Sequence, residues 1–261
     1  MALNGKVALI TGGVKNLGAA AARELASSGA NLALHYHSDS SKGDATTLEA
    51  ELKKSYPNIK VAFYQGNLTS AGAVTKLFQD ALKDFGKIDI VVNTVGKVLK
   101  KPITEITEEE YDTMFAINSK TAFFVLKEAA AHVTDGGKII TIVTALLGAF
   151  TGYYTSYAEA SAKNSNPAAS ASTTLPRDRW TPVSSSRRNP KSKKTMSNSL
   201  LELAFFYPQE SPEAVEFHKS NGMGNRLTMV EDIAPIVRFL CTDGAWITGQ
   251  TIFANGGYTT R

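Results

Sequence analysis

Short runs of aliphatic residues alternate with longer amphipathic stretches from the start of the chain to Tyr157. The runs have the length and composition of strands buried on both faces, and the amphipathic stretches repeat at helical spacing. Strict alternation of this kind predicts an α/β fold with a doubly wound parallel sheet covered by helices on both sides. The expected strands are 7–10, 31–35, 61–65, 88–92, 138–143 and 250–253, and the expected helices are 17–28, 41–55, 71–85, 108–132 and 230–240.

The chain has 261 residues, 43% of them apolar, which suits a single domain over residues 1–261. One segment, 159–202, differs from the rest because it is rich in Ser, Pro, Lys and Arg and shows neither strand nor helix periodicity. We expect it to be irregular. Residues 159–200 hold eight basic and two acidic side chains, so the net charge of +4 belongs to this segment and does not predict nucleic-acid binding by the whole protein.

Cellular location and metal content are constrained by what the sequence contains. A single cysteine, Cys241, excludes an intramolecular disulfide and a cysteine-rich zinc site, and we expect no metal. The first residues do not resemble a secretory signal, and no apolar run approaches the roughly 18 residues that span a bilayer. We therefore expect a cytoplasmic protein that binds neither membrane nor nucleic acid.

A turn rich in glycine directly follows the first expected strand, with the sequence Thr-Gly-Gly-Val-Lys-Asn-Leu-Gly at residues 11–18. A strand that passes through glycines into a helix start presents backbone N–H groups and the positive helix end to a pyrophosphate. The turn therefore predicts a dinucleotide site, although a simple strand-to-helix turn is the alternative. Its candidate contacts are Gly12, Lys15, Asn16, Leu17 and Gly18.

This turn resembles the Thr-Gly-x-x-x-Gly-x-Gly signature of the short-chain dehydrogenase/reductase family. Over residues 4–158 and 203–260 the chain is similar to the 3-oxoacyl-reductase-like and fungal polyketide-reductase-like members. Asn16 replaces the middle glycine, and asparagine tolerates left-handed backbone angles better than most residues, so we expect the turn to form. The resemblance implies a Rossmann-like fold, a nicotinamide coenzyme and a homo-oligomer.

The end of the second expected strand bears on the choice of coenzyme. No carboxylate stands there to hold the ribose hydroxyls of NAD, and Lys15, His37 and Ser38 are placed to receive the extra phosphate of NADP. In the family, a basic residue at the Lys15 position marks a preference for NADP. We therefore expect NADP(H), the alternative being that these are exposed polar loop residues.

Further family positions carry over one at a time. The resemblance implies that Asn67 contacts the adenine, that Asn93 and Gly96 lie beside the coenzyme, and that Asn118 orders a water in a proton relay. Each asparagine has a plainer interpretation as a side chain that bonds to its local backbone.

Catalysis in this family uses a hydroxyl that polarises the substrate carbonyl, a tyrosine that exchanges a proton with it, and a lysine four residues after the tyrosine. The resemblance assigns the first two roles to Thr144 and Tyr157. The lysine position holds Ser161, and Lys163 falls on another face of a helix that turns about 100° per residue. Without that cation the phenol pKa is expected to stay near its usual value of about 10.

Two hypotheses remain at this point. The first is an NADP(H)-dependent oxidoreductase acting on a small carbonyl or secondary alcohol, with an apolar or ring-bearing substrate favoured by the aromatic residues between 205 and 217. The second is a catalytically impaired relative that binds nucleotide without turnover. The polar segment 159–202 also fits translation of a shifted reading frame or a retained intron.

Overall fold

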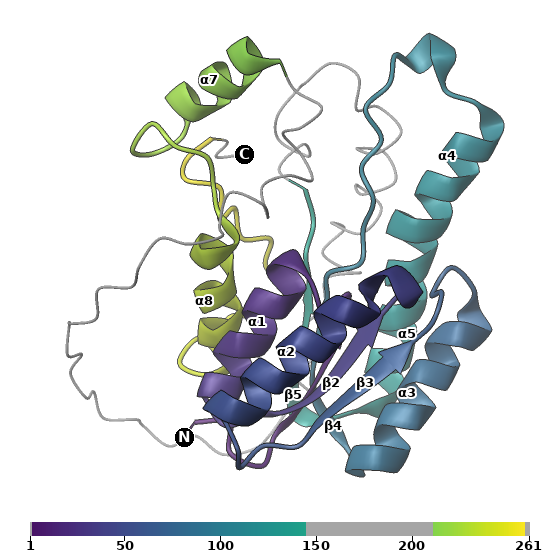
Figure 1. Ribbon diagram of the computed structural model, residues 1–261, viewed down its shortest axis with the longest axis vertical. Coiled ribbons are helices and arrows are strands. Elements are labelled where there is room, and N and C mark those ends of the chain that lie inside the picture. The colour runs from purple at the N-terminus through teal and green to yellow at the C-terminus, as the bar shows by residue number, and fades with distance from the viewer. Residues whose placement is uncertain (1, 145–210, 259–261) are drawn as a thin grey trace.

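The computed structural model describes residues 2–144 and 211–258 (Figure 1). Its centre is a sheet of five strands in the order β3-β2-β1-β4-β5, and every neighbouring pair is parallel. The predicted doubly wound parallel sheet is confirmed, whereas segment 159–202 lies outside the described residues. The strands are β1 (Val7–Thr11), β2 (Asn31–Tyr36), β3 (Val61–Gln65), β4 (Ile88–Asn93) and β5 (Val133–Thr141).

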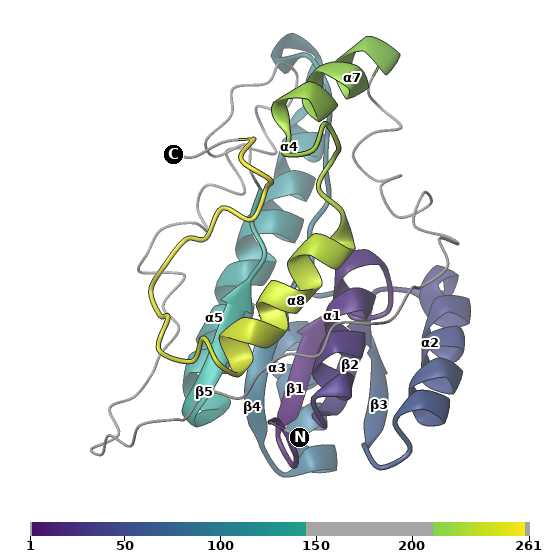
Figure 2. The ribbon, with the colours of Figure 1, turned by 90° about the vertical axis from the view of Figure 1, so that its left-hand side faces the viewer.

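Helices cover both faces of the sheet (Figures 1 and 2). On one face lie α1 (Asn16–Ser27), α2 (Lys42–Ser55) and α8 (Val230–Cys241), and on the other lie α3 (Ala71–Phe85) and α5 (Thr121–His132). Two further helices, α4 (Glu108–Met114) and α7 (Pro212–Asn221), extend beyond the carboxyl ends of the strands. No helix in the described ranges combines the length and apolar character needed to cross a bilayer.

The strands contribute side chains to two separate hydrophobic cores, one on each face of the sheet. In β1, Ala8 and Ile10 pack toward α1 and α8, while Leu9 packs toward α3 and α5. Successive side chains of a strand point to opposite faces, so a strand covered on both sides must be apolar throughout. This explains why the sequence shows continuous apolar runs instead of alternating ones.

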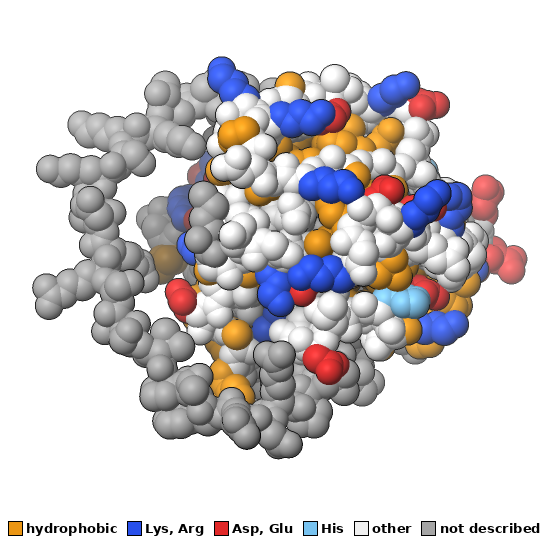
Figure 3. All heavy atoms as spheres, turned by 90° about the horizontal axis from the view of Figure 1, so that it is seen from below, with side chains coloured by type: hydrophobic (Ala, Val, Ile, Leu, Met, Phe, Trp, Pro, Cys, Tyr) orange, Lys and Arg blue, Asp and Glu red, His pale blue; other side chains and the backbone are white. Residues whose placement is uncertain are grey.

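The amino ends of three strands are joined by one buried carboxylate. Asp89 of β4 accepts hydrogen bonds from the Val7 N–H at 2.9 Å and from Thr134 Oγ1 at 2.9 Å, and its carboxylate is paired with Lys6 and Lys87. Burial raises the pKa of Asp89, but these hydrogen bonds hold it below its ordinary value. Figure 3 views this end of the molecule, where side chains of both charges are interspersed.

Two sequence predictions need correction. The expected helix 108–132 is divided by a π-helical turn, Phe115–Lys120, between α4 and α5. The strand expected at residues 250–253 is wrong, because the chain there is irregular and exposed and forms no ladder with a described strand. Gly249 turns the chain just before it with φ 66°, and Lys138 of β5 donates to the carbonyls of Ala245 and Ile247.

Candidate functional site

The candidate site lies where the strand order reverses, between β1 and β4. Ligands of open parallel sheets bind at such a switch point, beyond the carboxyl ends of the strands. The two strand ends are joined here, because Thr11 Oγ1 donates to Asn93 Oδ1 at 2.6 Å and Thr94 Oγ1 donates to the Thr11 carbonyl at 2.6 Å. Asn93 is almost fully buried, so the structure uses it to join the strands beside the predicted coenzyme surface.

The turn after β1 requires glycine at two of its predicted positions. Gly12 has φ 65°, and a Cβ there would lie 2.9 Å from Thr94 Oγ1. A Cβ on Gly18 would lie 2.1 Å from the Gly12 carbonyl oxygen, which is well inside contact distance. Helix α1 is therefore packed directly against the turn, which brings its amino end to the switch point.

The amino end of α1 is suited to an anion. Lys15 is the N-cap residue, and in the described structure it makes no side-chain hydrogen bond to the helix. The N–H groups of the first turn, from Asn16 to Gly18, have no intrahelical acceptor and carry the positive end of the helix dipole. Asn16 adopts φ 46°, which confirms that asparagine forms this turn in place of glycine.

The residues predicted to receive a ribose phosphate surround the start of α2. The Lys15 ammonium pairs with Asp44 at 2.9 Å, and both side chains are about half exposed. His37 is exposed in the loop after β2, and Ser38 Oγ lies 3.0 Å from Ser40 Oγ. Sequence reasoning missed Asp44, which is brought to Lys15 only by the packing of α2 beside α1.

The loop after β3 is anchored to α5. Asn67 Oδ1 accepts the Thr69 N–H at 3.1 Å, which is the local backbone contact that remained as an alternative for this residue. Leu68 is buried, and its carbonyl accepts the Thr121 hydroxyl at 2.9 Å. The loop is therefore held in place on the side of the site that faces β2 and β3.

Asn118 is buried in the π-helical turn and fixes the loop after β4. Its Oδ1 accepts the Lys97 N–H at 2.8 Å, and its Nδ2 donates to the Lys97 carbonyl at 2.9 Å. A Cβ on the neighbouring Gly96 would lie 3.3 Å from Asn118 Oδ1. The structure thus brings Asn118 and Gly96 together, with the amide holding the backbone that leads away from the switch point.

Of the predicted catalytic residues, the structure describes Asn118 and Thr144. Thr144 is buried just beyond the carboxyl end of β5, the strand beside β4. Tyr157, Ser161 and Lys163 lie outside the described residues. The position of the tyrosine relative to Thr144 therefore remains a prediction from sequence.

Sequence reasoning also missed His35, which is only 3% exposed within the apolar strand β2. Its Nδ1 accepts the Gly12 N–H at 3.2 Å, so Nε2 carries the proton and donates to the Gly66 carbonyl at 2.8 Å. Burial lowers the pKa of His35 from 6.5 to about 4, which keeps the ring neutral at physiological pH. A histidine directly after the buried aliphatic run 32–34 was the available signal.

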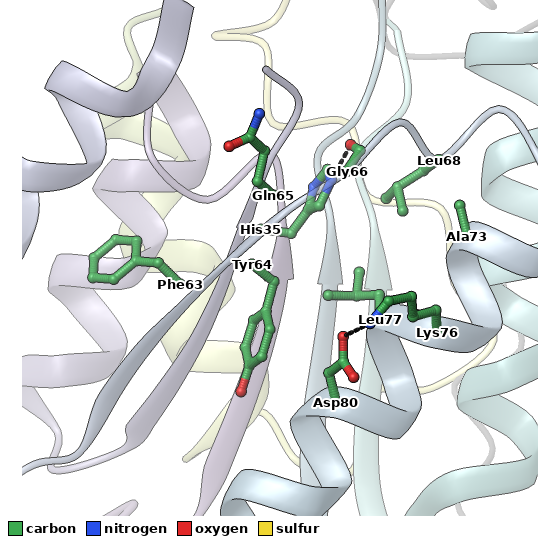
Figure 4. A pocket seen from close by; sticks show the side chains of 10 residues that line it. All are labelled: His35, Phe63, Tyr64, Gln65, Gly66, Leu68, Ala73, Lys76, Leu77 and Asp80. Atoms are coloured by element: carbon green, nitrogen blue, oxygen red, sulfur yellow. Dashed lines mark hydrogen bonds and ion pairs between the residues drawn. The ribbon is translucent and has the colours of Figure 1, made fainter. Parts of the chain in front are cut away.

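A small cavity adjoins His35 between β3 and α3 (Figure 4). Its volume is about 260 Å³, and its walls include Tyr64, Lys76 and Asp80, with the last two paired at 2.7 Å. Ligand pockets usually measure about 300–1,000 Å³. The cavity is therefore too small for a dinucleotide, and the carboxyl edge of the sheet remains the candidate coenzyme surface.

Comparison with known proteins identifies the family of this chain. Residues 12–170 match the family model described as enoyl-(acyl carrier protein) reductase. A crystal structure of a protein of the dehydrogenase class from Burkholderia cenocepacia, with bound NADP, is 43% identical and has a TM-score of 0.82, covering 100% of this chain and 96% of its own. A blue fluorescent protein from a metagenomic library, solved in complex with NADPH, is 26% identical with a TM-score of 0.79 and full coverage of both chains.

A fungal relative also aligns along nearly the whole length. The hydroxynaphthalene reductase-like protein Arp2 of Metarhizium brunneum is 29% identical over 266 residues, which cover 99% of this chain and 96% of the relative. The family match spans the glycine turn, Asn93, Asn118 and Thr144. This chain belongs to the short-chain dehydrogenase/reductase family.

Proposed function

We propose that the chain is an NADP(H)-dependent oxidoreductase that transfers hydride between the coenzyme and a carbonyl or secondary alcohol. The observation that carries the proposal is the turn from Gly12 to Gly18, whose backbone presents the amino end of α1 at the switch point of the sheet. The coenzyme, when bound, supplies the hydride chemistry. The chain itself binds and orients the reactants and moves the proton.

Each predicted contact has a place in this proposal. The first-turn N–H groups of Asn16, Leu17 and Gly18 bind the bridging phosphates, while Lys15, His37 and Ser38 receive the additional phosphate of NADP. In this proposal Asn67 contacts the adenine and Gly96 lies beside the nicotinamide half, while the buried Asn93 joins the strand ends next to it. Support for NADP comes from the Burkholderia and metagenomic relatives, which were solved with NADP and NADPH.

Proton transfer is assigned to three residues. Tyr157 exchanges a proton with the substrate oxygen, the Thr144 hydroxyl polarises that oxygen, and Asn118 orders the relay that returns the proton. Asn93 is the last residue of β4 and Thr144 follows the neighbouring strand β5, which puts both at the carboxyl edge of the sheet and supports their use at one site. Ser161 stands where the family has lysine, so we expect the Tyr157 phenol to lack the cation that lowers its pKa.

The experiment is NADPH oxidation by the full-length protein with a panel of aliphatic and aromatic ketones. We expect turnover that is lost in Tyr157→Phe while NADPH binding is retained. Tyr154→Phe is the matched control, because it removes a neighbouring phenol that the proposal does not use. Binding of NADPH without oxidation of any ketone would instead support the catalytically impaired relative.

The substrate class, the cellular location and the oligomeric state are also proposals. An apolar or ring-bearing carbonyl substrate is supported by the aromatic residues between 205 and 217 and by the hydroxynaphthalene reductase-like relative. Phe217 of α7 is exposed beyond the carboxyl ends of the strands. We further propose a cytoplasmic homo-oligomer, and light scattering of the purified protein tests its assembly.

A further inference from the structure

His35 connects the two loops that flank the predicted coenzyme surface. Its ring accepts the Gly12 N–H on one side and donates to the Gly66 carbonyl on the other, at 3.2 Å and 2.8 Å. The backbone adds two more links, because the Gly13 N–H donates to the His35 carbonyl and the Gly66 N–H donates to the Tyr36 carbonyl. The end of β2 therefore touches both the turn after β1 and the loop after β3.

The imidazole ring suits this position chemically. A neutral imidazole has one acceptor and one donor on opposite sides of a rigid ring, so it spans a fixed gap between an N–H and a carbonyl. The Gly12 N–H permits only the tautomer with an unprotonated Nδ1. An aliphatic side chain here would leave both part-buried backbone groups without these partners.

We propose that His35 is a positioning residue for the coenzyme, which rests on the proposed function. It holds the Gly12 turn and the Gly66–Leu68 loop at a fixed separation, so that one nucleotide meets the α1 terminus and Asn67 together. His35 Nδ1 also accepts the hydrogen bond of the Gly12 N–H, so this N–H is not available to a phosphate. The phosphates are thereby left to the first-turn N–H groups of α1.

The test compares His35→Leu with His35→Asn in the full-length protein. Leucine removes both ring contacts, whereas asparagine keeps an acceptor near the position of Nδ1 and loses only the link to Gly66. His35→Leu no longer holds the two loops at the separation that one nucleotide bridges, so binding must order them; we expect the NADPH Kd to rise about tenfold in His35→Leu and by less in His35→Asn. The kcat at saturating NADPH is expected to stay within about twofold, since His35 makes no contact in the proposed proton relay.

The control is His132→Asn, which removes a histidine of α5 that pairs with Glu128 away from both loops. Its NADPH Kd should equal that of the wild type. If wild-type protein binds neither coenzyme, both the proposed function and the role of His35 are contradicted. If wild-type protein binds NADPH and a folded His35→Leu binds it equally well, only the role of His35 is overturned.

A measurement on the wild type keeps the proposal testable if the leucine variant does not fold. Nitrogen NMR of protein labelled with ¹⁵N-histidine reports the tautomer of each ring. We expect one ring that is neutral at pH 7, protonated on Nε2 and shifted by NADPH. A charged ring, the other tautomer, or a His35 signal unmoved by NADPH would overturn the proposal.

Discussion

The ammonium of Lys15 is held 2.9 Å from a carboxylate oxygen of Asp44. In the proposed coenzyme site, Lys15 binds the additional phosphate of NADP. In that site the carboxylate and the phosphate would compete for one cation, so we expect NADP binding to weaken the pair between Lys15 and Asp44. The cost is small, because an ion pair between half-exposed side chains contributes only about 0.2–1 kcal/mol.

Removal of the competing carboxylate should strengthen NADPH binding. For Asp44→Asn we expect the NADPH Kd to fall by about twofold to fivefold at low salt, while the NADH Kd stays unchanged. Fluorescence titration of both coenzymes measures the effect. Glu49→Gln is the control, since it breaks the Lys53–Glu49 pair on the same helix. Equal changes for NADH and NADPH would show that Asp44 does not act through the phosphate.

The neutral state of His35 predicts a pH dependence of stability. Burial lowers the pKa of His35 from 6.5 to about 4, the bond to Gly66 opposes this shift, and His37 adds to it. As the pH falls from 6.5 to 4, the unfolded chain binds a proton that the folded chain excludes. The His35 contribution to the free energy of unfolding is therefore complete above pH 6.5 and decreases below it, by up to about 3 kcal/mol at pH 4.

Urea unfolding of the wild type and His35→Asn between pH 4 and pH 8 measures this contribution. Carboxylates that titrate in both proteins cancel in the comparison. The charged neighbours Lys76 and Asp80 line the same cavity and are retained in both. We expect the stability gap between the two proteins to narrow as the pH falls. A gap that is constant across this range would contradict a buried neutral imidazole.

Asn16 is predicted to be a tolerated replacement for glycine, and not a required residue. Its φ of 46° lies in the left-handed region, which glycine adopts without strain and alanine disfavours by about 1–2 kcal/mol. We expect Asn16→Gly to leave the free energy of unfolding within about 0.5 kcal/mol of the wild type and Asn16→Ala to lower it by about 1 kcal/mol. Equal stability of the two variants would show that the backbone there is not left-handed.

The Asp89 cluster is predicted to stabilise the sheet without serving the site. Asp89→Asn removes the charge that faces Lys6, Lys87, Thr134 and the Val7 N–H, and we expect it to lower the free energy of unfolding by about 2–4 kcal/mol. The NADPH Kd of the folded variant should remain within twofold of the wild type, because Asp89 is at the amino end of the strands. A large loss of coenzyme affinity in folded protein would contradict this separation.

Local signals in the sequence were enough to predict most elements of the fold. The expected 61–65 strand and 71–85 helix coincide with β3 and α3. Their ends are set by nearby residues: Ser70 caps α3 by accepting the Ala73 N–H, and Gly86 ends it with φ 77°. Such boundaries depend on side chains within a few positions, so they can be read from sequence.

Features that depend on contacts between distant segments could not be predicted in this way. The His35 ring meets Gly12 and Gly66, which are 23 and 31 positions away in the chain. The π-helical turn is found where Asn118 contacts the Lys97 backbone. Helical periodicity could not predict it, because that contact joins segments that are distant in the chain. The expected strand at 250–253 shows the converse, because its composition is typical of a strand but no described strand pairs with it.

Direct titration of the purified protein with NADPH and NADH tests the central claim, that the glycine turn and Lys15 form an NADP site. Enhancement of coenzyme fluorescence reports binding whether or not the protein catalyses a reaction. We expect saturable binding of NADPH that is at least about tenfold tighter than that of NADH, since a charge-assisted contact to the additional phosphate contributes about 1.5–3 kcal/mol. Folded protein that binds neither coenzyme, or that binds NADH more tightly, would contradict the account.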